Sequence, residues 1–312
     1  MGKQNEYTLM KARSAQSVLA AGFRLYNDHF SKFFKASWLM TLLYAAVFSA
    51  AGTLAAIQTP ALIARLMTTS PSAEQQAAVL THLALLWGLF MVGAIVETLT
   101  YATIVNKLDE HSQTDTIATP ASWWRIERRM MMRTLKGALS TAVILFVFGF
   151  IWGFVDGILP SQSVVALTVR CIVVGALILL SIPLPYVLMR YLLNGSLSYW
   201  PAFRHSYSTG LRHLGLSLTV WLGALLTVFL LGLIAALPAM LLGFTNWEAQ
   251  NGVLIGDPLG MPSYITHLTA STTFFTGILL VYLRIPLLCV NYYLYGSIEK
   301  RERQKAQDTA NP

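Results

Sequence analysis

The chain alternates long apolar segments with shorter polar ones. Six segments are apolar over 20 residues or more: 38–57, 79–105, 137–158, 164–193, 214–243 and 268–297. A helix rises 1.5 Å per residue, so about 20 residues cross the hydrocarbon core of a bilayer. A backbone in hydrocarbon must pair its own polar groups, and these segments lack the strict alternation of barrel strands. The pattern predicts an all-α fold, a polytopic membrane bundle of six transmembrane helices.

The last apolar segment carries a charge near its middle. Residues 268–295 contain one charged side chain, Arg284. An arginine at that depth normally faces protein or a water-filled cavity, so the other helices are expected to hide it. Glu97, in the second segment, differs from Arg284 in depth by roughly 8 Å if both helices stand straight. We expect these two side chains to pair inside the bundle, as a structural contact or as part of a proton or substrate relay.

The third and fourth segments contain two further candidate contacts. Asp156 and Arg170 flank the short turn between these segments, which favours a clasp near the outer leaflet. Gly149, Gly153 and Gly157 form a ridge of small residues at a spacing of four. Such ridges let another helix approach closely in lipid. We expect this ridge to pack a helix, from the same chain or from a second protomer, with internal packing favoured.

Composition and charge placement support a membrane protein with a fixed orientation. Hydrophobic residues make up 55% of the chain and charged residues 12%, against about 25% charged residues in soluble domains. The mean hydropathy is +0.56. The 22 Lys and Arg outnumber the 14 Asp and Glu, which gives a formal net charge of +8. Of these 22 basic residues, 19 fall in the two termini and in the loops and helix ends on one side. The positive-inside rule then places both termini in the cytoplasm, and lipid rather than nucleic acid becomes the expected partner.

The N-terminal residues predict an uncleaved membrane anchor. Six Lys and Arg precede the first apolar segment, and no apolar core of a leader peptide occurs before Trp38. We therefore expect a cytoplasmic arm over 1–36, a six-span domain over 37–298 and a charged cytoplasmic tail over 299–312. Short loops and the lack of a eukaryotic sorting signal favour the inner (plasma) membrane of a bacterium.

Amphipathic segments precede the odd-numbered spans. Apolar stripes at helical spacing run through 19–33 and 200–214, and a rougher one through 123–131. Basic and aromatic helices of this kind lie in the headgroup plane. Their expected basic patch consists of Arg125, Arg128, Arg129, Arg133, Arg204 and Arg212. It is interpreted either as an anchor for the bundle or as a surface that recognises anionic lipid or docks another membrane protein.

A short motif recurs in the fourth and sixth spans. Ile182-Pro183-Leu184 is repeated as Ile285-Pro286-Leu287, and each copy runs on to a Gly-Ser pair. The plan of interfacial helix, span, outer loop and span therefore occurs three times, with no proline in the first copy. Proline kinks a membrane helix, and these kinks are expected to shape the packing or to open a cavity.

Signatures of catalysis are missing from the sequence. The six histidines are dispersed at or outside the span ends, with no pair at the i, i+4 spacing of a helix-borne metal site. No nucleophile elbow, phosphate-binding loop or dinucleotide fingerprint occurs. Cys171 and Cys289 lie within apolar segments toward opposite leaflets and are expected to pack rather than to pair. We expect no metal, no cofactor and no enzyme activity.

The three-unit plan resembles a group of six-span bacterial membrane proteins that are grouped with the membrane domain of some glycerophosphodiester phosphodiesterases. The resemblance rests on residues 23–39, on residues 203–216 and on the two Ile-Pro-Leu turns. It implies no catalytic residue, because that activity belongs to a separate soluble domain. Two functions remain open: a structural or accessory protein acting through its basic interfacial helices, or a small transporter or carrier of a hydrophobic ligand. A carrier would hold its cavity near Glu97, Arg284 and the two kinks.

Overall fold

The computed structural model describes residues 8–60, 62–63, 72–114, 117, 127–159, 163–195, 198–254 and 262–310. Every regular element within these ranges is a helix, and six of the helical segments are long and apolar enough to cross a membrane. These segments are Phe30–Gln58, Ala73–Thr114, Arg128–Ile158, Val164–Leu193, Leu214–Gln250 and Tyr264–Thr309. The predicted all-α bundle of six spans is confirmed, and the protein is a multi-pass membrane protein.

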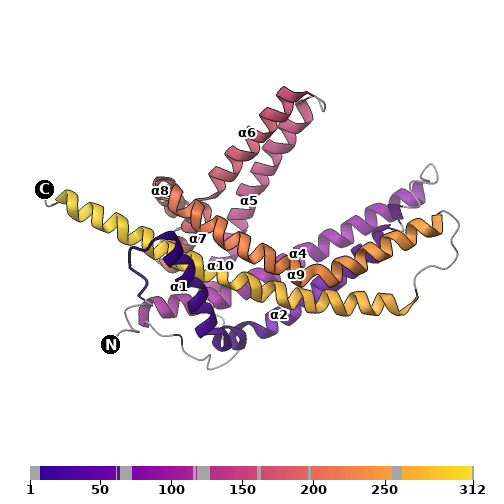
Figure 1. The fold of residues 1–312 in the computed structure, drawn as a ribbon, viewed down its shortest axis with the longest axis horizontal. Coiled ribbons are helices and arrows are strands. Elements are labelled where there is room, and N and C mark those ends of the chain that lie inside the picture. The colour runs from indigo at the N-terminus through magenta and orange to yellow at the C-terminus, as the bar shows by residue number, and fades with distance from the viewer. Residues whose placement is uncertain are drawn as a thin grey trace. The chain divides into compact units, whose positions relative to one another are not determined.

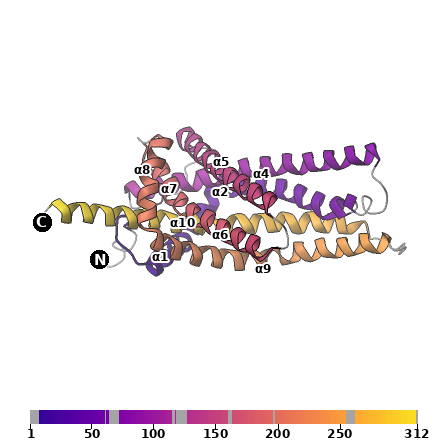
Figure 2. The same cartoon turned by 90° about the horizontal axis from the view of Figure 1, so that it is seen from above.

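The elements follow one another in a simple order (Figure 1). They are α1 (Ala15–Asp28), α2 (Phe30–Thr53), the π-helical η1 (Leu54–Gln58), α4 (Ala73–Thr114), α5 (Arg128–Ile158), α6 (Val164–Ser181), α7 (Leu184–Leu193), α8 (Tyr199–Arg212), α9 (Leu214–Leu254) and α10 (Tyr264–Ala310). Figure 2 shows the same helices from above. Helix α10 has 47 residues, more than a bilayer requires, and its charged end extends the last span.

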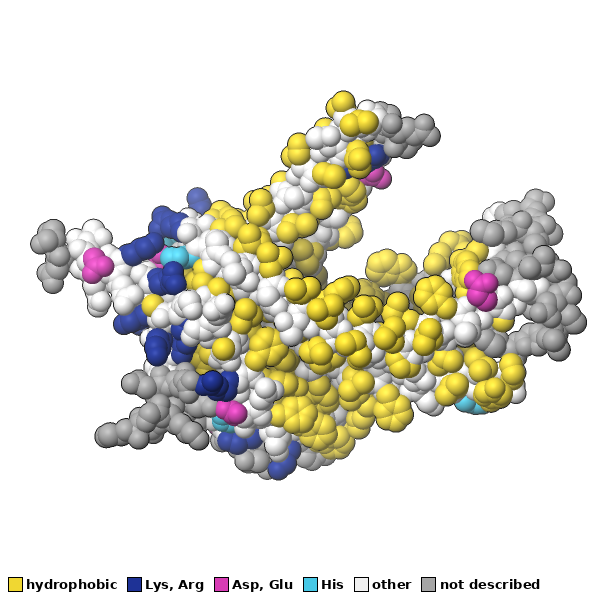
Figure 3. All heavy atoms as spheres, in the orientation of Figure 1, with side chains coloured by type: hydrophobic (Ala, Val, Ile, Leu, Met, Phe, Trp, Pro, Cys, Tyr) yellow, Lys and Arg dark blue, Asp and Glu magenta, His cyan; other side chains and the backbone are white. Residues whose placement is uncertain are grey.

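The chain divides into two compact units. Ser37–Tyr101 and Thr227–Ile285 form one unit, which we call the apolar unit. Met1–Ala36, Ala102–Leu226 and Pro286–Pro312 form the other. By sequence the second unit holds 20 of the 22 Lys and Arg, all except Arg65 and Arg284, and we call it the basic unit. In Figure 3 most of the dark blue side chains lie around α1, α8 and the end of α10, apart from those near the tip of the α5–α6 hairpin.

Helices α1 and α8 are matching elements of the basic unit. Each has 14 residues, begins after a serine (Ser14 or Ser198) and ends at a histidine (His29 or His213). The two histidines share a backbone conformation, with φ −116° and ψ 15° in one and φ −107° and ψ 26° in the other. The next helix begins at the following residue in both cases. These shared features support the repeat, and they place equivalent residues 184 positions apart.

The buried residues of α1 and α8 also occupy equivalent positions in the two helices. The buried residues of α1 include Val18, Gly22 and Leu25, and those of α8 include Ala202, Ser206 and Thr209. Each pair is separated by 184 residues. Helix α8 therefore packs through small side chains, while its aromatic stripe stays at least partly exposed. Of the rough middle segment expected over 123–131, the first five residues are outside the described ranges, and the rest lie at the start of α5.

Helix α8 packs on an Ile-Pro-Leu motif, and α1 packs on the segment that follows the other one. A Cβ atom on Gly210 of α8 would lie 2.8 Å from Cβ of Pro183. A Cβ atom on Gly22 of α1 would lie 2.7 Å from Cα of Val290 in α10. Helix α8 thus packs on the second hairpin, and α1 packs on the third hairpin.

The two Ile-Pro-Leu motifs have different local structures. Helix α6 ends at Ser181 and α7 begins at Leu184, so the fourth span is broken at Pro183. Pro286 lies within the continuous helix α10. The fourth span contains a second proline, Pro185, within the first turn of α7. Two missing N–H donors in three residues break a helix more readily than one, and proline is well accommodated in a first turn.

The apolar unit is built from parts of α2, α4, α9 and α10. Ser49 Oγ donates to the carbonyl of Ala270 at 2.6 Å, and Gly277 packs against Ala45 and Phe48, so α2 and α10 are close neighbours. Asn246 of α9 donates to the carbonyl of Ala56 in η1. A π-helical turn leaves backbone groups without their usual partners. The Asn246 amide therefore stabilises the η1 turn.

Helix α10 is the most enclosed span. Half of its most apolar stretch is buried, against 17% or less in the other five spans. In the basic unit its buried polar groups find partners on distant segments. Tyr292 Oη lies 2.8 Å from His111 Nδ1 of α4, and Ser297 Oγ accepts from the Arg13 backbone N–H at 3.0 Å. The last helix is therefore the centre of this unit.

Replacement of Gly22 by alanine tests this close packing. The new Cβ would meet the Val290 backbone, which cannot rotate away as a flexible side chain can. Gly22→Ala should lower the free energy of unfolding by about 1–3 kcal/mol. Thermal unfolding in detergent measures the change.

Gly149→Ala is the matched control, because no atom lies within 4 Å of a Cβ built there. Its thermal midpoint should match that of the original protein or exceed it, since alanine favours helix. Equal midpoints for the two variants would contradict the packing of α1 on α10.

Candidate functional site

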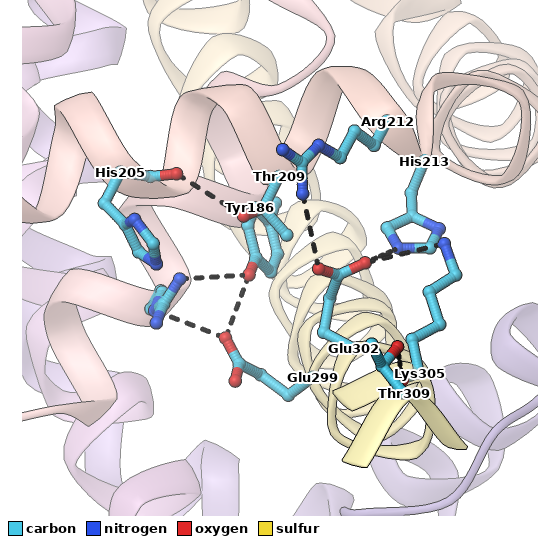
Figure 4. Close-up of polar contacts among 10 residues, drawn as sticks. Tyr186, His205, Thr209, Arg212, His213, Glu299, Glu302, Lys305 and Thr309 are labelled. Atoms are coloured by element: carbon cyan, nitrogen blue, oxygen red, sulfur yellow. Dashed lines mark hydrogen bonds and ion pairs between the residues drawn. The ribbon is translucent and has the colours of Figure 1, made fainter. Parts of the chain in front are cut away.

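Two glutamates in the C-terminal part of α10, Glu299 and Glu302, contact basic side chains of α7 and α8 in the basic unit (Figure 4). Tyr186 of α7 donates to Glu299 Oε1 at 2.9 Å, and Arg190 Nε lies 3.2 Å from the same oxygen. His213 Nε2, at the end of α8, lies 2.7 Å from Glu302 Oε1. The apolar pattern and the charge placement do not predict this cluster. Its signal was two acidic residues three apart, hence on one helix face, directly after an apolar span.

The Glu302 carboxylate lies close to three basic side chains. Besides His213, it has Lys305 Nζ at 3.7 Å from Oε1 and Arg212 Nη1 at 4.0 Å from Oε2. Figure 4 shows Arg212 and Lys305 directed toward this carboxylate from α8 and α10. One carboxylate cannot neutralise two permanent cations and a histidine, so positive charge remains on this surface.

The predicted basic patch separates into two groups with different surroundings. Arg129 Nη2 donates to the Gly195 carbonyl at 2.7 Å, and Arg133 donates to the carbonyls of Tyr191, Asn194 and Gly195. These acceptors lie at the end of α7, where helical carbonyls lack partners and a cation is favoured. Arg129 and Arg133 therefore cap α7. Arg128 is exposed at the start of α5, and Arg125 lies outside the described residues.

Arg204 and Arg212 form the exposed group of the patch, on α8. Together with Pro201, His205, Ser208 and Thr209 they line a crevice of about 500 Å³. Trp200 is 68% exposed beside it. Aromatic rings continue along the helix, with centroids 6.1 Å apart for Tyr199 and Phe203 and 5.2 Å apart for Phe203 and Tyr207. Helix α8 thus exposes Arg204, Arg212 and Trp200, whereas Tyr199 packs on Tyr191 of α7, with ring centroids 5.2 Å apart.

Arg13 is a buried cation of the basic unit that the sequence analysis did not single out. Its guanidinium lies 4.6 Å from the centroid of the Tyr293 ring and donates to the carbonyls of Leu9 and Thr8 at 3.2 and 2.7 Å. Burial lowers the pKa of Arg13, and the neighbouring tyrosines oppose that shift. Backbone carbonyls satisfy this charge, so Arg13 holds the N-terminal arm on α10.

The structure brings Glu97 and Arg284 together in the apolar unit. Arg284 Nη1 lies 2.5 Å from Glu97 Oε1, and Tyr101 Oη donates to the same oxygen at 2.5 Å. Tyr44 of α2 is a further neighbour of the arginine. The Arg284 side chain is still 39% exposed and that of Glu97 20% exposed. The expectation that the bundle hides Arg284 is therefore only partly met within this unit, because α2 and α4 cover one side of it.

The apolar unit also contains an open apolar cavity of about 490 Å³. Residues of α2 and η1, α9 and α10 line it, including Gly52, Ala56, Ala239, Gly243 and Thr276. Its lining on α10 runs from Thr273 to Leu280, which is one to three helical turns before Arg284. The carrier hypothesis placed its cavity at the ion pair and the two Ile-Pro-Leu prolines. Pro183 and Pro286 belong to the basic unit.

The third and fourth spans bring one expected pair together. Arg170 Nε lies 2.7 Å from Asp156 Oδ1, and Arg170 Nη2 donates to the Leu159 carbonyl at 3.2 Å. The clasp therefore joins α5 to α6. Around Gly149, Gly153 and Gly157, by contrast, no atom of the described chain lies within 4 Å of an added Cβ. The glycine ridge is not an internal packing surface of its unit, because neighbouring α5 side chains such as Phe150 and Phe154 are exposed too.

The cysteines and other potential metal ligands remain apart. Cys289 is buried in α10 and Cys171 is exposed on α6, and both are free thiols. Only Cys289 is therefore placed as a packing residue. Among the described residues, no three His, Cys, Asp or Glu side chains come together as a metal site would require.

Comparisons of this chain with protein-family models, with curated proteins and with solved structures each find no match.

Charge reversal tests the ion pair of the apolar unit. Glu97→Arg or Arg284→Glu alone places two like charges side by side within a membrane span, where charges are costly. Each single variant should reduce the yield of folded protein severalfold. The double reversal should restore most of it, as measured by size-exclusion chromatography of extracted protein. A double variant as poor as the singles would contradict the pairing.

Proposed function

We propose that this protein is a non-catalytic accessory protein of the membrane, whose interfacial helices hold anionic lipid at one membrane face. The exposed face of α8 carries this proposal. The helix buries small residues such as Ala202 and Gly210, while Arg204, Arg212 and Trp200 are exposed. A helix that only completed the bundle would have no need of basic and aromatic side chains on its outer face.

The chemistry of α8 suits the boundary between lipid and water. Tryptophan and tyrosine concentrate at headgroup level, because their rings are apolar and their polar atoms remain hydrated. Each Lys or Arg near an anionic leaflet adds roughly 1 kcal/mol of attraction. Helix α1 repeats the arrangement with Phe23 and Arg24 on its outer side. Two such helices would anchor the basic unit to the lipid surface.

The proposed location follows from charge. The basic unit contains nearly all the Lys and Arg, and positive residues are retained on the cytoplasmic side during insertion. We therefore place both termini and the basic segments outside the spans of this unit at the cytoplasmic face of the inner (plasma) membrane. The anionic lipids of that leaflet would be its principal partners, and a second membrane protein docked on the same surface is compatible with this role.

A carrier of hydrophobic ligands is the second candidate. The cavity lined by Gly52, Ala239 and Gly243 supports it, because it is apolar and lies within the membrane-spanning segments. Ligand sites are usually apolar with a few polar groups, and Thr276 supplies one here. The ion pair of Glu97 and Arg284 would then adjust the packing of the helices near this cavity.

Reconstitution into lipid nanodiscs of two compositions tests the proposed function. The thermal midpoint should be higher in phosphatidylglycerol mixed with phosphatidylcholine than in phosphatidylcholine alone. Added salt should reduce the difference, because it screens exposed charges. Equal midpoints in the two lipids would contradict the proposal. A bound apolar molecule retained equally in both compositions would favour the carrier.

A further inference from the structure

We infer that the crevice on α8 is a binding site for the phosphate of one anionic phospholipid headgroup. The inference rests on the proposed function, because it requires α8 to lie at the headgroup level. It goes further in assigning a single site with a defined chemistry. The residues that carry it are Arg204, His205, Ser208 and Arg212.

The spacing of these residues brings their side chains to one face. Arg204, Ser208 and Arg212 are four residues apart along α8, so they follow one another on successive turns. The two arginines bracket Ser208, with about 12 Å between their backbones, a span that two flexible arginine side chains can close. Guanidinium groups bind phosphate through paired hydrogen bonds, and a serine hydroxyl adds a donor between them.

The electrostatic balance of the crevice favours an anion. Arg204 has no ion-pair or hydrogen-bond partner among the described residues. Arg212 is 4.0 Å from Glu302, and that carboxylate is also shared with His213 and Lys305. The crevice therefore lacks at least one negative charge, and a phosphate diester would supply it.

Helix α1 provides an internal control for this assignment. It matches α8 in length, in its terminal serine and histidine and in its buried positions. At the positions equivalent to Arg204, His205 and Arg212 it has Ala20, Ala21 and Asp28. The shared architecture thus forms without these basic residues. Their presence on α8 alone indicates a task other than folding.

The aromatic side chains indicate that the phosphate belongs to a lipid. Trp200 is exposed beside the crevice, and the partly exposed ring of Phe203 lies next to it, with centroids 5.8 Å apart. Rings at headgroup level contact the upper acyl chains. A phosphate bound at this helix would therefore have its acyl chains next to an aromatic surface. Inorganic phosphate would gain nothing from that surface.

Native mass spectrometry of the full-length protein released from nanodiscs tests the site. The nanodiscs contain phosphatidylglycerol as a minor component in phosphatidylcholine. The original protein should retain one phosphatidylglycerol. Arg204→Ala/Arg212→Ala should lower that retention about tenfold or more, because each arginine contributes charge-assisted hydrogen bonds. Arg204→Ala/His205→Ala, which reproduces the residues of α1 and keeps the contact of Arg212 with Glu302, should also lower it.

Lys11→Ala/Lys35→Ala is the matched control, because it removes two exposed cations of the same unit outside α8. This variant should retain the lipid. Equal loss in the control and in the α8 variants would overturn the site in favour of general surface charge. Retention in both α8 variants would also overturn it. Thermal midpoints in phosphatidylcholine alone should match for all variants, and a variant that fails this check is replaced by the other α8 variant.

Two further results separate the site from the proposed function. Millimolar inorganic phosphate should not displace the lipid, and full displacement would assign the crevice to free phosphate instead. If the α8 variants keep the lipid while phosphatidylglycerol still stabilises the protein, the site is wrong and the proposed function stands. If phosphatidylglycerol stabilises no variant and not the original protein, the proposed function itself fails.

Discussion

The basic unit depends on hydrogen bonds made by the buried polar groups of α10. Tyr292 and Ser297 have no exposed surface, and groups buried within a membrane protein must find partners inside the protein. Those partners are His111 of α4 and the backbone of Arg13, segments far away in the sequence. Gly22 allows the required approach, since its lack of a side chain lets α1 contact the α10 backbone. The buried polar groups of α10 therefore join the N-terminal arm, the end of α4 and α1 in a single unit.

Charge is handled differently in the two units. In the apolar unit one arginine meets one glutamate, so the charges balance within the pair. In the basic unit cations outnumber carboxylates, and several are satisfied by backbone carbonyls instead. Arg13 and Arg133 both use carbonyls that helices and turns leave unpaired. Arg204 and Arg212 of α8, by contrast, donate to no such carbonyl of the described residues and are exposed. The surface of this helix is therefore the one that bears on the proposed function.

The sequence predicts the helices well and their contacts less evenly. Hydropathy identified all six spans, because length and apolarity are properties of each segment alone. Counting residues from the span ends placed Glu97 near Arg284, since depth follows directly from helical rise. The inner face of α8 was not predicted, because apolar spacing in a membrane protein does not distinguish lipid from protein. Small residues such as Ala202 and Ser206 mark that face. The structural role of Arg129 and Arg133 depends on where α7 ends, which hydropathy does not reveal.

The junctions at His29 and His213 have a mechanical consequence. A single residue joins α1 to α2 and α8 to α9, so no loop separates either pair of helices. His213 is the junction between α8 and the start of α9, and its Nε2 atom contacts Glu302 of α10. A change in the direction of α8 therefore also changes the direction in which α9 begins, because only His213 lies between the two helices.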